Sequence, residues 1–96
     1  MEIGEFQELM RHTYLERDHR RGKDGTFRWL TEEVGELARA LRLEEREQIR
    51  EELADVLAWL SSLANLVGIE LEEAAERYDR GCPKCGEIPC ACVFRP

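Results

Sequence analysis

The chain has 96 residues, a length that allows one small domain rather than two. Asp and Glu number 21 against 14 Lys and Arg, so the formal net charge is -7. An acidic chain is a poor candidate for binding nucleic-acid polymers or anionic membranes, because both are negatively charged. No apolar run approaches the roughly 20 residues that span a bilayer, and no signal peptide is apparent.

Hydrophobic periodicity predicts four helices in an all-α chain, because apolar residues recur every three or four positions and strand alternation is absent. The helices are expected over about 2–20, 26–42, 46–67 and 71–80. Two glycines lie in the polar break before the second helix, whose N-cap is predicted to be Thr26. Gly68 is expected to end the third helix, and a non-helical tail is expected over 81–96. The predicted organisation is therefore a helical domain over 1–80, followed by the tail over 81–96.

The third predicted helix is apolar on almost every side between Val56 and Val67. Such a helix needs neighbours on several faces, and about 80 residues of short helices give a thin core. We therefore expect a homo-oligomer, a dimer or a tetramer, with this helix at the subunit contact. The alternative is that the other three helices of the same chain wrap around it.

Acidic residues cluster on the second and third predicted helices. Residues three or four apart share a helix face, so carboxylates pair within each helix. In an antiparallel hairpin with the two apolar stripes facing, the two acidic flanks lie on the same side and are mirrored about residue 44. The sequence therefore predicts that four carboxylates converge, from Glu33, Glu36, Glu52 and Asp55.

Four carboxylates cannot all stay ionised without a counter-charge. Either some of them are protonated, or a hard divalent cation lies among them. Oxygen ligands suit Mg²⁺ or Mn²⁺, and Ca²⁺ less specifically. Because Mg²⁺ often shares its coordination shell with substrate phosphates, this pattern indicates phosphate chemistry. The alternative interpretation is an ordinary solvated acidic face.

The spacing Glu-Glu-x-x-Glu at 32–36, followed by Glu-x-x-Asp at 52–55, resembles the signature of the MazG-like nucleoside triphosphate pyrophosphohydrolases. The resemblance extends over about 27–75. It implies an all-α, four-helix MazG-like bundle in a dimer or dimer of dimers. It also implies Mg²⁺-dependent cleavage of a nucleoside or deoxynucleoside triphosphate between the α and β phosphates. By motif match, Glu33, Glu36, Glu52 and Asp55 are the implied metal ligands, and Glu32 is an extra carboxylate that binds a second ion or orients water.

Other side chains are candidates for binding the substrate. Trp29 and Trp59 lie at positions mirrored about residue 44 and either stack on a nucleobase or pack against protein. Asn65 either hydrogen-bonds the substrate or caps a helix across a dimer. The only dense basic run either contacts phosphates or is an ordinary helix C-terminus; it comprises Arg17, Arg20, Arg21 and Lys23. His12 and His19 are expected to be surface residues.

All four cysteines lie in the tail, with the spacing Cys-Pro-Lys-Cys-Gly followed by Cys-Ala-Cys. Four thiolates in eleven positions fit one tetrahedral zinc site, which would order a tail too short for an apolar core. Alternatives are a redox pair, disulfides or a mobile tail without metal. Clustered reduced thiols favour the cytoplasm. The predicted structural zinc ligands are Cys82, Cys85, Cys90 and Cys92.

The predicted function is thus Mg²⁺-dependent hydrolysis of a nucleoside triphosphate to a monophosphate and pyrophosphate, in nucleotide-pool cleaning. Two alternatives stay open at this point. One is an inactive helical adaptor with a zinc tail. The other is an enzyme of the same kind that acts on phosphoribosyl-ATP.

Overall fold

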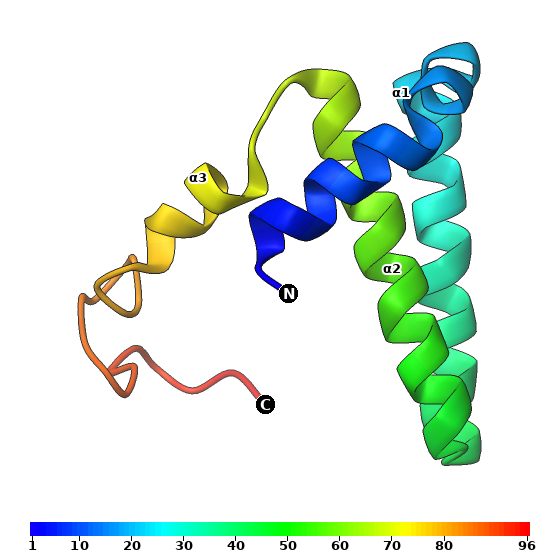
Figure 1. Cartoon of the computed structure of the whole chain (residues 1–96). Helices are drawn as coiled ribbons and strands as arrows, with labels where there is room; N and C mark the ends of the chain where they lie inside the picture. The colour runs from blue at the N-terminus through cyan, green and yellow to red at the C-terminus, as the bar shows by residue number, and fades with distance from the viewer.

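The computed structural model describes all 96 residues, and every regular element in it is helical. Helix α1 covers Ile3–Leu43, α2 covers Arg46–Val67 and α3 covers Leu71–Ala75; a single 3₁₀ turn follows over Glu76–Tyr78. The remaining residues form an irregular tail (Figure 1). The prediction of an all-α chain is confirmed.

Helix α1 is bent sharply at Gly22. The backbone there has φ 83° and ψ 168°, a conformation that is open almost only to glycine. The bend divides α1 into an N-terminal arm (3–21) and a C-terminal arm (23–43), and Figure 1 shows the two arms running in different directions. The predicted loop before residue 26 is wrong, since one glycine makes the whole turn. Thr26 is therefore not an N-cap but a fully buried residue inside the helix.

The C-terminal arm and α2 form an antiparallel hairpin (Figure 1). The chain reverses at Glu44, which has φ 55° and caps α1, its backbone N–H donating to the Leu41 carbonyl at 3.2 Å. The backbone N–H of Glu45 donates to the Ala40 carbonyl at 3.3 Å. The hairpin turn thus falls at the residue about which the acidic positions are mirrored.

Gln7 joins the three helices near the other end of α2. Its side-chain nitrogen donates to Asn65 Oδ1 at 3.0 Å and to the Ile69 carbonyl at 2.9 Å. Its Oε1 accepts the backbone N–H of Leu71 at 2.7 Å, so Gln7 satisfies an otherwise unpaired N–H at the start of α3. Gln7 is fully buried, and its hydrogen bonds fasten the N-terminal arm across the hairpin.

The helix predicted over 71–80 is shorter than expected, because α3 ends at Ala75 and only the 3₁₀ turn follows. The single chain is therefore a bent hairpin with one short terminal helix, and the predicted four-helix bundle is not confirmed. No single helix is long and apolar enough to cross a membrane. Helix α2 and the segment Leu71–Tyr78 reach the necessary length and apolar content only together, and the chain bends by 105° between them.

The interior of the chain is small and largely polar. Only nine residues are buried, and the apolar ones are Met10, Ala40 and Ala64. The apolar stripes predicted on the two helices of the hairpin are only partly covered. Five of their residues are half-buried (Leu30, Leu37, Ile49, Val56 and Leu63), and five are exposed (Val34, Leu41, Leu53, Leu60 and Val67). The acidic flank lies at the hairpin seam, where Glu52 is buried.

Candidate functional site

Three carboxylates from the two helices of the hairpin meet at its seam. Glu33 comes from the C-terminal arm, and Glu52 and Asp55, three residues apart, come from one face of α2. One oxygen from each lies within 4.8 Å of the others. We call Glu33, Glu52 and Asp55 the acidic cluster.

The acidic cluster is electrostatically strained in the absence of a cation. The pKa of Glu33 is raised from 4.5 to about 7. Burial is the main cause, followed by a hydrogen bond to Glu52 that Glu33 can donate only when it is protonated, and by the negative charge of Asp55. A proton or a metal ion would relieve the same repulsion.

Glu52 is the least exposed carboxylate of the cluster. Its Oε1 accepts a hydrogen bond from the Gln48 side chain at 2.7 Å, but its buried Oε2 has no partner. A buried carboxylate oxygen without a partner is costly. Three convergent carboxylates with one unpartnered oxygen fit a hard divalent cation such as Mg²⁺ or Mn²⁺.

The other two carboxylates of the motif lie outside this group. Glu36 is exposed and lines a shallow pocket with Arg39 and Gln48. Its charge nevertheless contributes to the raised pKa of Glu33. Glu32 is exposed on the neighbouring face of the C-terminal arm. Both are therefore accessible to a ligand that approaches the cluster from solvent.

A pocket of about 300 Å³ begins at the acidic cluster and extends between the N-terminal arm and α2. Asp55 belongs to both the cluster and the pocket. The bend at Gly22 makes this pocket possible, because it folds the N-terminal arm back over α2. The pocket combines cationic, acidic and aromatic side chains: Tyr14, Arg17, Asp18, Arg21, Asp55, Ala58, Trp59 and Ser62.

The two tryptophans stack on each other. Their ring centroids are 5.9 Å apart and their planes differ by 15°. The Arg21 guanidinium carbon lies 4.7 Å from the centroid of Trp59, on which it makes a cation–π contact. Trp29 is half exposed, and Trp59 lines the pocket. The aromatic pair therefore forms a wall beside the acidic cluster.

Arg21 is fixed on both sides of the bend. Its Nη1 donates to Asp18 Oδ1 at 2.9 Å and to Thr26 Oγ1 at 3.2 Å. Of the predicted basic run, Arg17 and Arg21 line the pocket. Arg20 is exposed, and Lys23 approaches only Asp24, at 3.5 Å.

The remaining candidates lie away from the pocket lining. Asn65 accepts hydrogen bonds from Gln7 and from Arg11, and its own side-chain nitrogen donates to the Gln7 carbonyl. It thus serves to fasten the N-terminal arm. His12 is exposed and interacts with Glu8 at 2.9 Å, and His19 is exposed.

Sequence reasoning missed Asp18, which is 1% exposed and lines the pocket. Its Oδ1 accepts from Arg21, while Oδ2 is buried without a partner. Tyr14 and Ser62 were also missed. The available signal was the spacing of three between Asp18 and Arg21, but such pairs are common on exposed helices, and only the bend buries this one.

A second cluster of possible metal ligands lies in the tail. The sulfurs of Cys82, Cys85, Cys90 and Cys92 all lie within 4.8 Å of one another, and all four thiols are free. Backbone N–H groups, first that of Ala91, lower the pKa of Cys85 to about 6. Neighbouring sulfurs, first that of Cys90, raise the pKa of Cys92 to about 12. Cys85 and Cys92 therefore do not ionise together without a cation.

Comparison with known families gives one match. The model of the MazG nucleotide pyrophosphohydrolase domain matches residues 21–85, which is more than half of the chain. The match includes the acidic cluster, both tryptophans and the first two cysteines. No curated protein matches the chain.

Proposed function

This chain belongs to the MazG nucleotide pyrophosphohydrolase family, and on that premise we propose that it hydrolyses a nucleoside or deoxynucleoside triphosphate to a monophosphate and pyrophosphate. The proposed cofactor is Mg²⁺ or Mn²⁺. The observation that carries the proposal is the acidic cluster, in which Glu52 has an unpartnered buried oxygen and Asp55 lines a cationic and aromatic pocket.

Glu33, Glu52 and Asp55 are the proposed metal ligands, and Glu36 is proposed to join them when the substrate is bound. When bound, the cation neutralises phosphate charge and makes water more acidic. Glu32, exposed beside the cluster, is proposed to orient the attacking water. Because these carboxylates repel a triphosphate that carries no metal, substrate binding should depend strongly on the cation.

Arg17 and Arg21 are proposed to contact the phosphates, since both line the pocket that Asp55 enters. Arg21 is held by Asp18 and Thr26, so its position is set before the substrate binds. In the proposed reaction, water oxygen forms a bond to the α-phosphorus. The bond from that phosphorus to the oxygen bridging the α and β phosphates breaks, pyrophosphate leaves, and a carboxylate takes the water proton.

The nucleobase is proposed to stack on Tyr14 and to lie against Trp59 in the same pocket, since Trp29 and Arg21 already cover the faces of the Trp59 ring. Base–aromatic stacking contributes about 1–3 kcal/mol in single-strand binders and tolerates different bases. The exposed half of Trp29 extends the same wall. This arrangement supports a nucleotide ligand without selecting one base.

A homo-oligomer is part of the proposal. Support comes from the outward-facing apolar residues of the hairpin and from the small apolar interior of the single chain. The exposed apolar side chains of the two stripes are Val34, Leu41, Leu53, Leu60 and Val67. Burying them between copies would supply the core that one chain lacks.

The test is pyrophosphate release from a panel of ribo- and deoxyribonucleoside triphosphates with Mg²⁺ or Mn²⁺. Glu52→Gln and Asp55→Asn are expected to lower kcat at least about 100-fold, the scale on which lost electrostatic stabilisation acts. Glu51→Gln is the matched control, because Glu51 is an exposed neighbour on α2 outside the cluster. Absence of pyrophosphate with every nucleotide would refute the activity, and unchanged rates in the two variants would refute the site.

A further inference from the structure

The tail over 81–96 follows a defined path without an apolar core. Its three largest apolar side chains, Ile88, Val93 and Phe94, are 78%, 92% and 82% exposed. The hydrogen bonds of this segment that leave it reach back only to the 3₁₀ turn, and none reaches α1 or α2. Another interaction must therefore hold the tail in its shape.

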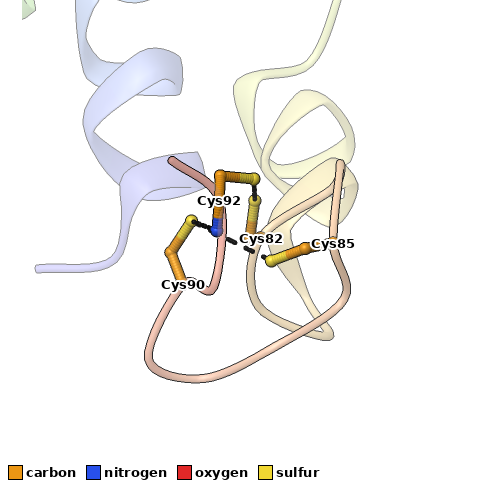
Figure 2. Close-up of side chains that lie close together, drawn as sticks. All are labelled: Cys82, Cys85, Cys90 and Cys92. Carbon is orange, nitrogen blue, oxygen red and sulfur yellow. Dashed lines mark hydrogen bonds between the residues drawn. The ribbon is translucent and has the colours of Figure 1, made fainter. Parts of the chain in front are cut away.

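The four cysteine side chains point toward a common centre (Figure 2). The Sγ atoms of Cys82 and Cys92 are 3.8 Å apart, and those of Cys85 and Cys90 are 3.9 Å apart. A tetrahedral ion with Zn–S bonds of about 2.3 Å separates its sulfur ligands by about 3.8 Å. These two sulfur–sulfur distances match a filled tetrahedral site, and the remaining ones are within 4.8 Å.

The backbone around the sulfurs is arranged to stabilise thiolates. The N–H of Ala91 donates to Cys85 Sγ at 3.3 Å. The N–H of Cys92 donates to Cys90 Sγ at 3.4 Å (Figure 2). Gly86, with φ 74°, turns the chain directly after Cys85, and its N–H donates to the Cys82 carbonyl at 2.7 Å. Hydrogen bonds to ligand sulfurs are the outer-shell support that metal thiolate sites use.

We propose that Cys82, Cys85, Cys90 and Cys92 bind one Zn²⁺ ion as a closed structural site. Four thiolates fill the tetrahedral shell, so the ion has no open position for substrate. Zn²⁺ with four thiolates carries two net negative charges. Arg77, Lys84 and Arg95 line a groove with three of the cysteines and place positive charge beside it.

The zinc site is separate from the proposed catalytic function. Sulfur ligands select Zn²⁺, whereas the oxygen ligands of the acidic cluster select Mg²⁺ or Mn²⁺. Ligand chemistry therefore directs two different metals to two separate sites of one short chain. The zinc orders the tail, and its loss is expected to leave the hairpin folded, since no hydrogen bond or ion pair joins the two.

The test measures metal content and thiol reactivity in the full chain purified without added metal, with no nucleotide present. We expect about one zinc per chain, released as a mercurial reagent titrates about four thiols. This readout uses the unaltered protein, so it does not depend on any variant folding. It is also independent of catalysis, so the zinc proposal and the proposed activity fail separately.

Variants then locate the ion. Cys90→Ser and Cys92→Ser are expected to lower the zinc content at least about tenfold, while the far-ultraviolet circular dichroism of the helices is unchanged. Ala91→Ser, which lies between these two ligands, is the matched control and is expected to keep its zinc, as is Glu52→Gln. Iron in place of zinc, two disulfides without metal, or zinc retained in both cysteine variants would overturn the proposal.

Discussion

Glu33 makes the stability of the metal-free protein depend on pH. Its pKa is about 7 in the folded chain against an ordinary value of 4.5, so between these values the folded state binds more protons than the unfolded state. The free energy of unfolding should therefore fall as the pH rises from about 4.5 to about 7. Thermal unfolding in a chelator across this range measures the effect.

Two comparisons isolate the effect of Glu33. Glu33→Gln should flatten the dependence of the free energy of unfolding on pH. Glu32→Gln, at an exposed neighbouring residue, should leave this dependence in place. Saturating Mg²⁺ should reverse the trend, because the cation takes the place of the proton. A melting temperature that rises through the same pH range in chelator would contradict the raised pKa of Glu33.

Asp18 should matter for stability although no sequence motif marks it. Asp18→Ala removes the hydrogen bond that holds Arg21 and is expected to lower the free energy of unfolding by about 1.5–3 kcal/mol. Asp18→Asn keeps an acceptor for Arg21 and should cost less. Chemical denaturation measures both, with Asp24→Ala as control; Asp24 is 96% exposed and should change stability by less than about 0.5 kcal/mol. Equal effects at the two positions would count against the buried role of Asp18.

For single residues, the sequence predicted the acidic cluster better than the polar side chains around it. The spacing of Glu33, Glu52 and Asp55 carries helical phase, and phase alone brings them to one seam once the chain reverses at Glu44. The roles of Asp18 and Gln7 depend on where the N-terminal arm crosses α2. Helical periodicity contains no information on that crossing, so these residues could not be found from the sequence.

The bend in α1 is the element on which the pocket depends. Gly22→Ala should lower the free energy of unfolding by about 1–3 kcal/mol, because alanine does not tolerate the backbone conformation found there. Gly35→Ala is the matched control: Gly35 lies in the regular part of α1 with open space around it, and alanine there should stabilise by about 0.5–1 kcal/mol. Denaturant titration of the two variants compares them, and stabilisation by both would rule out the strained geometry at Gly22.

Helix α2 and the hairpin turn were predicted well, because a long periodic segment ends at a glycine and a short charged link precedes it. The break in α1 was predicted in the right place but as a loop. One glycine is enough to turn the chain there, because Arg21 donates hydrogen bonds both to Asp18 before the bend and to Thr26 after it. Helix α3 is shorter than predicted because another part of the chain supports only its first turn, where Gln7 accepts a hydrogen bond from the backbone N–H of Leu71.

At the scale of the whole molecule, the exposed residues of the apolar stripes predict self-association. Leu53→Glu should lower the mass of the assembly to that of a smaller oligomer or a monomer. The reason is that it places a charge on an apolar face that we expect to be buried between copies. Sedimentation equilibrium measures the mass. Val93→Glu makes the same change in the exposed tail and should leave the mass unchanged. A monomeric unaltered protein would refute the oligomer.

The position of the turn at Glu44 has a consequence for how the molecule assembles. The acidic cluster lies wholly within 33–55, so its members meet through short-range contacts, which form early in folding. The N-terminal arm docks through contacts such as Gln7–Asn65, separated by 58 positions. The carboxylates therefore begin to repel one another while the hairpin closes, before the N-terminal arm docks and forms the pocket. A divalent cation that offsets this repulsion is expected to speed the folding of the chain more than it slows its unfolding.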